Sequence, residues 1–188
     1  MNSPGKPCDE TYRAVMELAK DPLYQTIVVA ANWETIFADA QDSGNVAQMK
    51  ADFSRLHDAG KSIVLLAMNP HSPVLSPQHL ARPFRLALLT GAVLDPTATV
   101  WVPRDAVASD PQSLKRLAAF AADIGASVID PYAYFCDAQR CIALDGGAPI
   151  NSDAYHLSER AVRTHATFVD GLVGAPAIGG PVTAPESR

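Results

Sequence analysis

The sequence lacks a long apolar run and a block of basic residues, and each absence excludes a class of protein. No run approaches the roughly 18 apolar residues that a membrane-spanning helix needs. Residues 1–20 are charged and contain no apolar core of a signal peptide, so we expect no export signal in this chain. A net charge of −5 without any Lys or Arg cluster excludes the electrostatic footprint of a nucleic-acid or anionic-membrane binder. We therefore expect a neutral small molecule or a glycan as the partner.

Cysteine is scarce, with three residues in the chain. Cys136 and Cys141 have four residues between them in a turn-like stretch and are close enough to be bridged, which would indicate an oxidising compartment. Two free thiols, or half of a metal site, remain alternatives. No second Cys pair or nearby His pair completes a tetrahedral zinc site, so we expect no metal. Cys8 is left over, and we expect its partner outside this chain.

Glycine-rich phosphate loops are also missing, because none follows any predicted strand, and we expect no cofactor. What the sequence does have is 188 residues that are 48% hydrophobic, enough for one globular domain with a substantial core. We place this domain at residues 9–173. Residues 1–8 read as a loose N-terminus, and residues 174–188 are too poor in large apolar side chains to fold.

The first half of the chain alternates helical and strand patterns. Asp9 can cap a helix over residues 10–20, and residues 45–59 form a second helix that ends at Gly60. Residues 25–31 and 61–67 are short apolar runs typical of strands buried on both faces of a parallel sheet. The apolar helix positions that we expect to face inward are Tyr12, Val15, Met16 and Ala19, then Val46, Met49, Phe53 and Leu56.

The second half repeats the alternation. A helix over residues 111–124 precedes a third strand over residues 126–130, a hairpin turns at Gly146 and Gly147, and a last helix covers residues 157–173. Residues 82–101 favour a helix followed by irregular chain. The expected inward positions are Leu114, Leu117, Phe120 and Ala121, then Leu157, Ala161, Val162, Phe168, Val169 and Leu172, with His165 on the same stripe as a core or boundary histidine.

This order of elements predicts the fold class. Helices that alternate with buried strands favour right-handed crossovers and a parallel sheet between helix layers, a three-layer α/β/α sandwich with flavodoxin-like topology. Residues 69–83 hold four prolines and follow the second strand, a position where loops line ligand crevices. His71 and His79 lie in that loop, and we interpret them as solvated side chains because no ligand-type residue stands at binding distance in sequence.

The stretch most suggestive of catalysis is Asp153-Ala-Tyr-His156, directly ahead of the last helix. A histidine that acts as a general base needs a carboxylate to hold its other ring nitrogen, and Asp153 can fold back onto His156 to do this. The alternative is that Asp153 or Ser158 only caps the helix and His156 is a surface residue.

A resemblance favours the chemical interpretation. Three segments together resemble the closing part of SGNH (GDSL-like) domains, in particular those fused to integral-membrane O-acyltransferases of acyltransferase family three, whose pattern joins a short Cys loop to a D-x-x-H-L-S signature. The likeness covers about residues 8–172, and upstream Ile27-Val-Val-Ala-Ala-Asn-Trp33 is similar to a strand end of that branch. The three segments are Phe135-Cys-Asp-Ala-Gln-Arg-Cys141, Asp145-Gly-Gly-Ala-Pro-Ile150 and Asp153-Ala-Tyr-His-Leu-Ser158.

The resemblance implies roles for single residues. His156 is then the general base, Asp153 its orienting partner, and Asn32 the oxyanion donor, although Ala30 replaces the family's usual glycine there. A plain strand-end turn residue is the alternative for Asn32. The resemblance further implies an extracytoplasmic, periplasmic location and a disulfide in the Cys loop. It also implies an acylated glycan or small ester as substrate and a membrane acyltransferase domain in the parent protein.

One family element is missing. SGNH enzymes carry the nucleophilic serine in a Gly-Asp-Ser element at the end of their first strand, and the only serine ahead of residues 25–31 is Ser3, which no strand precedes. We therefore expect a domain without its first strand or strands, through truncation, a misassigned start or loss. Two functions follow: the C-terminal part of an O-acetyl transferase or esterase acting on cell-surface glycans, or a non-catalytic remnant or binding module. A flavodoxin-like small-molecule binder is disfavoured by the missing phosphate loop.

Overall fold

A computed structural model describes residues 7–38, 43–81, 97–107 and 111–172. The described residues form two compact units. The first contains those up to Leu66 and the segment Gln112–Val128, and the second contains those from Ala67 to Pro111 and from Ile129 onward. Of the predicted loose N-terminus, residues 1–8, the first six lie outside the described residues, and Pro7 and Cys8 belong to a helix instead. The tail 174–188 and residues 82–96, where a helix was expected, also lie outside the described residues.

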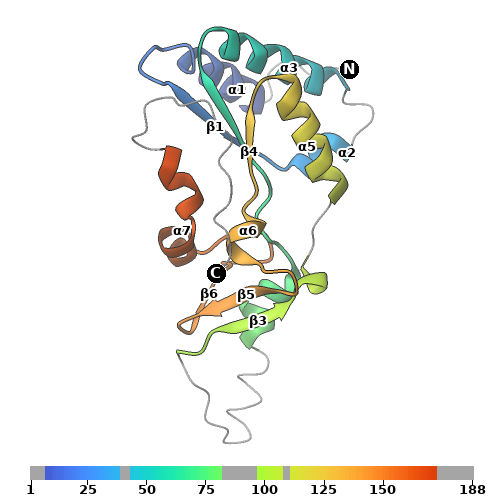
Figure 1. Ribbon diagram of the computed structural model, residues 1–188, viewed down its shortest axis with the longest axis vertical. Coiled ribbons are helices and arrows are strands. Elements are labelled where there is room, and N and C mark those ends of the chain that lie inside the picture. The colour runs from blue at the N-terminus through green and yellow to red at the C-terminus, as the bar shows by residue number, and fades with distance from the viewer. Residues whose placement is uncertain (1–6, 39–42, 82–96, 108–110, 173–188) are drawn as a thin grey trace, which may run out of the picture. The chain divides into compact units, whose positions relative to one another are not determined.

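A parallel sheet organises the first unit. Its strands are β1 (Thr26–Ala30), β2 (Ser62–Leu66) and β4 (Ser127–Ile129), in the order β1-β2-β4. β1 and β2 pair in parallel from Thr26 opposite Ser62 to Ala30 opposite Leu66. The predicted mixed α/β class with a parallel sheet is confirmed, and Figure 1 shows helices running alongside the strands.

Four helices complete this unit. They are α1 (Pro7–Leu18), α2 (Trp33–Ala38), α3 (Ser43–Asp58) and α5 (Pro111–Asp123). Side-chain contacts tie α3 to two of the others. The Tyr12 hydroxyl of α1 donates to Asp52 at 2.9 Å, Lys50 pairs with Asp123 of α5 at 2.6 Å, and the rings of Phe53 and Phe120 meet edge to face.

Three details of the first unit differ from the sequence-based expectation. Asp9 is not a cap, because α1 begins two residues earlier at Pro7, a residue suited to the first helical position. Val15 is exposed, while Tyr12 and Met16 of the same helix are partly buried. Leu114 of α5 is exposed too, unlike the buried side chains of Leu117, Phe120 and Ala121.

β1 is the largest correction. We expected it to be buried on both faces, but it lies at one end of the described sheet, and Val28 is 45% exposed. β2, which has neighbours on both sides, has the buried residues Ile63, Val64 and Leu65. The same β-branched pattern thus serves an edge strand and a central strand, because burial depends on which neighbours the sheet supplies.

The second unit contains an antiparallel sheet of β3 (Val100–Pro103), β5 (Arg140–Asp145) and β6 (Ala148–Pro149). β5 and β6 form the predicted hairpin, whose turn uses Gly146 and Gly147 at positive φ angles of 53° and 74°. We did not predict β3, which pairs with β5 from sequence positions about 40 residues upstream.

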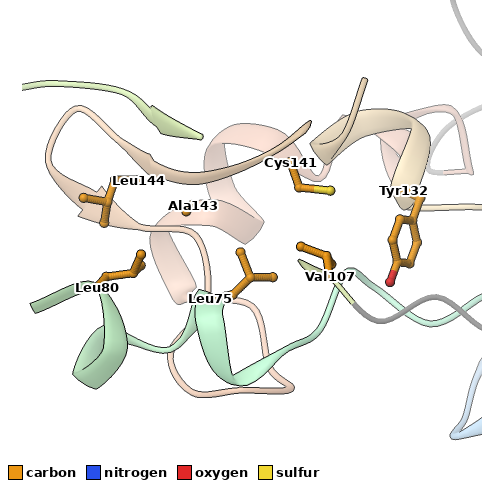
Figure 2. Packing of buried hydrophobic residues seen from close by; sticks show 7 residues of the cluster. All are labelled: Leu75, Leu80, Val107, Tyr132, Cys141, Ala143 and Leu144. Carbon is orange, nitrogen blue, oxygen red and sulfur yellow. The ribbon is translucent and has the colours of Figure 1, made fainter. Parts of the chain in front are cut away.

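The core of the second unit forms where β5 meets the loop after β2. Figure 2 shows Cys141, Ala143 and Leu144 of β5 facing Leu75 and Leu80, with Val107 and Tyr132 completing the cluster. Leu75 belongs to the short helix η1 (Pro73–Leu75), Val107 follows η2 (Arg104–Ala106), and Tyr132 opens α6 (Tyr132–Phe135). The proline-rich segment therefore contributes to a hydrophobic core as well as to a loop.

The last predicted helix is two elements. α7 (Glu159–His165) ends at Ala166, and the 3₁₀ helix η3 (Thr167–Leu172) follows. The break lets Phe168 pack on Tyr134 at 5.1 Å and near Phe135 at 6.4 Å between ring centroids, so tertiary packing overrides the helical pattern. Val162, expected to face inward, is exposed on α7. His165 lies at the core boundary, with its ring near Phe135 and its Nε2 3.0 Å from Asp145.

Candidate active site

The loop between β6 and α7 is closed at its base by backbone hydrogen bonds. Asn151 and Leu157 form an antiparallel bridge, and the Ser158 amide donates to the Ile150 carbonyl at 2.7 Å. Inside this bridge, the Ser152 amide donates to the His156 carbonyl at 2.8 Å. The segment from Asn151 to Leu157 is therefore a compact loop with a fixed shape.

Ser158 caps the helix that follows. Its hydroxyl accepts from the Ala161 amide at 3.2 Å and donates to the Pro149 carbonyl at 2.7 Å. We had weighed both Asp153 and Ser158 as caps of this helix. Because Ser158 has that role, the carboxylate of Asp153 is available for a different contact.

Asp153 holds His156 through both of its carboxylate oxygens. Oδ2 lies 2.8 Å from His156 Nδ1, while Oδ1 accepts from the His156 amide at 2.9 Å and from the Tyr155 amide at 2.7 Å. Three nitrogen atoms from two residues thus converge on one carboxylate. The backbone bonds set the loop, and the side-chain bond orients the imidazole.

These bonds keep Asp153 ionised. The Tyr155 amide first, then the bonds from the His156 ring and amide, lower the pKa of Asp153 to about 2. An ionised carboxylate at Nδ1 places the ring proton there, so that Nε2 is the proton acceptor. The His156 side chain is 76% exposed, and no described residue bonds its Nε2. The pair has the geometry of a general base with its orienting acid.

The segment after β2 supports this loop from behind. Asn69 Nδ2 donates to the Tyr155 carbonyl at 3.0 Å, and the Ser72 amide donates to the Ala154 carbonyl at 2.8 Å. The fully buried Asn151 donates from Nδ2 to the Pro70 carbonyl at 3.2 Å. These contacts attach the loop of His156 to residues 69–72, which follow β2 in the sequence.

His71 is where the solvated-loop interpretation was wrong. Its side chain is buried, its Nδ1 lies 3.1 Å from the Asn69 carbonyl, and its ring stacks on Tyr155 at 5.9 Å. The sequence offered no sign of this, because the ring that covers His71 lies more than 80 residues later in the chain. His79 is exposed, as expected.

The Cys loop is closed by a disulfide between Cys136 and Cys141, at the start of β5. Within the loop, Asp137 accepts from the amides of Gln139 and Arg140 at 2.8 and 2.9 Å. These backbone bonds lower the pKa of the Asp137 carboxyl. Within the described residues there is no group of three or more His, Cys, Asp and Glu side chains that could hold a metal ion.

Asn32 belongs to the first unit, whereas Asp153 and His156 belong to the second. Its Oδ1 accepts from the Thr35 amide at 3.0 Å, which caps α2. No described residue accepts a hydrogen bond from its Nδ2. The neighbouring Trp33 is buried and donates from its indole to the Leu66 carbonyl at 2.7 Å, so it stabilises the end of β2.

A comparison with protein families matches residues 1–170 to the family described as "SGNH domain (fused to AT3 domains)". The chain belongs to this SGNH family. The residues of this SGNH domain that match the family model include the loop in which Asp153 contacts His156. No curated protein and no solved structure matches the chain. Among the described residues, no helix is long and apolar enough to span a membrane.

Sequence reasoning missed three residues of the candidate site. Asn69 and Asn151 anchor the loop to its support, and the exposed Tyr155 directly precedes His156 in the sequence. Asn69 had a usable signal, since it is a polar residue just after a buried strand. Asn151 and Tyr155 had none, because their partners at residues 69–71 are distant in sequence.

Proposed function

We propose that this SGNH domain supplies the His-Asp half of a serine-type site that transfers an O-acyl group, or hydrolyses an O-acyl ester, on cell-surface glycans. The observation that carries the proposal is the 2.8 Å contact between His156 Nδ1 and the ionised Asp153, with Nε2 open to solvent. A histidine held in this way is built to move a proton at Nε2.

The proposed reaction has two steps. His156 Nε2 takes the proton of a serine hydroxyl while the serine oxygen attacks the acyl carbonyl, and the imidazolium then returns the proton to the leaving alcohol. In the second step a sugar hydroxyl or water gives its proton to Nε2 and attacks the acyl-serine carbonyl. The bond from that carbonyl to the serine oxygen then breaks, and the imidazolium returns the proton to the serine oxygen. Asp153 stays ionised throughout and stabilises the imidazolium. The amide of Asn32 is the proposed donor to the oxyanion.

The nucleophilic serine is proposed to come from sequence outside these 188 residues, since the only serine ahead of β1 is Ser3. We further propose that the parent protein carries a membrane acyltransferase-3 domain, as the description of the family indicates, and that the SGNH domain lies outside the cytoplasm. A non-catalytic binding module is the second candidate, and the missing Gly-Asp-Ser element is the observation that favours it.

Hydrolysis of p-nitrophenyl acetate tests the serine assignment. The 188-residue chain should hydrolyse it near background, and His156→Ala should leave that rate unchanged. In a parent reading frame that encodes a Gly-Asp-Ser strand ahead of residue 1, His156→Ala should lower the rate by about 10³-fold or more. Turnover by the 188-residue chain that depends on His156 would contradict the assignment. A parent frame without such an element would support the binding module.

A further inference from the structure

Tyr155 is an exposed aromatic residue on a backbone that cannot easily move. Its amide donates to Asp153 at 2.7 Å, and its carbonyl accepts from Asn69 at 3.0 Å. The residue is nevertheless 58% exposed. Tyrosine combines a large apolar face with a polar hydroxyl, and for this reason it is enriched at interfaces where one end is apolar and the other is wet.

The ring is held from one side. Its centroid lies 5.9 Å from that of His71, with the two planes 28° apart, and His71 is itself buried beneath it. This is the only ring contact of Tyr155 among the described residues, and no described residue bonds its hydroxyl. One face is therefore supported, while much of the remaining ring and its hydroxyl face solvent.

Tyr155 is also fixed relative to His156. Both amides donate to the same oxygen, Oδ1 of Asp153, and the other oxygen of that carboxylate holds the His156 ring. The backbone of Tyr155 is therefore fixed relative to the residue that would accept the proton. Tyrosine suits a binding role because it offers a large contact area and loses little conformational entropy on binding.

We propose that Tyr155 is a platform on which a pyranose ring of the glycan stacks. A pyranose presents C–H groups on one face and hydroxyls around its rim, which match an aromatic face and a free phenol hydroxyl. The inference rests on the proposed function, because stacking there would carry an ester or hydroxyl of the sugar to His156 Nε2. It adds the residue that would contact the sugar ring of that substrate.

The competing explanation is structural, since the Tyr155 ring also covers His71. Tyr155→Leu separates the two roles, because leucine keeps an apolar cover but offers no aromatic face. Tyr155→Phe keeps the face and removes the hydroxyl. The matched control is Tyr24→Leu, which removes a 45% exposed tyrosine from the first unit.

Binding is measured on the 188-residue chain by NMR titration with methyl 6-O-acetyl-α-D-glucopyranoside, with ethyl acetate as the ester without a sugar. We expect Tyr155→Leu to weaken sugar binding roughly five- to tenfold and Tyr155→Phe to weaken it about threefold or less. Tyr24→Leu should bind like the native chain. No variant should change the response to ethyl acetate. Unchanged amide signals of Asp153 and His156 would show that the loop keeps its shape.

Two results overturn the platform: equal sugar affinity in Tyr155→Leu and the native chain, or no binding of the pyranose ester by the native chain. The proposed function fails separately. His156→Ala should retain sugar binding. If sugar binding depends on Tyr155 but the parent protein shows no His156-dependent esterase activity, the proposed chemistry is refuted and the platform is not. Conversely, His156-dependent esterase activity in the parent protein, together with sugar binding that Tyr155→Leu does not change, would refute the platform and leave the proposed chemistry intact.

Discussion

At the scale of single residues, the contacts of Asp153 define the shape of the candidate site. Its carboxylate accepts two backbone amides and the His156 ring, at 2.7, 2.9 and 2.8 Å. All three contacts favour the ionised form. Because they also shape the loop, the ionisation of Asp153 and the order of residues 151–157 are linked.

The first prediction concerns pH. The pKa of Asp153 in the folded chain, about 2, lies below the ordinary value of about 3.9. The stabilisation of the fold by the ionised carboxylate is therefore fully present above pH about 4 and is lost as pH falls through about 2. A carbon-detected NMR titration of the carboxyl should show a midpoint near 2. His156→Ala should raise the midpoint only in part, because the larger cause, the Tyr155 amide, remains. A midpoint near 3.9 in the native chain would contradict the contacts.

A second residue-scale prediction concerns the buried Asn151. It donates to the Pro70 carbonyl at 3.2 Å, and its Oδ1 has no hydrogen-bond partner in the described structure. Asn151→Ala removes the donor and should lower the free energy of unfolding by about 1–3 kcal/mol. Asn151→Asp should cost more at pH 7, because it places a charge without a donor in the same buried position.

Urea unfolding at two pH values checks this. Burial raises the pKa of an introduced carboxyl, so Asn151→Asp should regain stability as pH falls from 7 to 4, while Asn151→Ala should show no such recovery. Equal stability of the two variants at pH 7 would argue that residue 151 is not buried as the structure has it.

At the scale of elements, Trp33 joins the end of β1 to the end of β2. Its indole donates to Leu66 at 2.7 Å, and its ring contacts those of Phe37 and Phe120 at 5.9 and 6.5 Å. Trp33→Phe keeps most of the packing but leaves the carbonyl unsatisfied, at a cost of about 1–3 kcal/mol. Trp33→Ala also opens a cavity and should cost about 3–5 kcal/mol. Urea denaturation of both variants measures the difference, and an equal loss would mean that the hydrogen bond dominates.

The disulfide stabilises the start of β5. Cys136 and Cys141 close a short loop, and the chain-entropy relation gives about 2 kcal/mol for a loop of this length. Replacing both by serine should lower the free energy of unfolding by about that amount. Thiol titration of the denatured, unreduced chain should find one free thiol, from Cys8, and three after reduction. Three free thiols without reduction would contradict the bridge.

At the scale of the whole molecule, β1 leaves a sheet edge that no described strand covers. Exposed edges with apolar side chains favour pairing between chains. Val28 on β1 is 45% exposed, and Val15 and Leu18 of α1 are exposed as well. The chain should therefore self-associate as its concentration is raised.

A lysine on this edge should suppress association. Val28→Lys should shift the gel-filtration peak toward the monomer, because a charge on an edge strand opposes strand pairing. Val162→Lys is the matched control, because Val162 is 50% exposed but lies on the helix α7 and not on a strand. A native chain that elutes as a monomer, or equal effects of the two lysines, would contradict this origin of association.

Sequence patterns predicted the local features of this protein, because residues close together in the sequence determine those features. The helices at α3 and α5, the strand β2, the hairpin at Gly146 and the pairing of Asp153 with His156 all depend on residues within a few positions of one another. The identity of the family followed from the same short segments. Periodicity and turn chemistry were sufficient to predict these features, because the residues that form them are close together in the sequence.

Only the tertiary structure decided which strands are edges, which loop residues are buried and what surrounds the dyad. Val28 and Val64 lie in similar apolar strands, yet one is exposed and the other buried, because the order β1-β2-β4 gives β2 two neighbours. His71 became a buried support only because Tyr155 covers it. By itself the sequence determined the contact between Asp153 and His156, which are three residues apart. The support behind it joins segments about 80 residues apart, which no local pattern encodes.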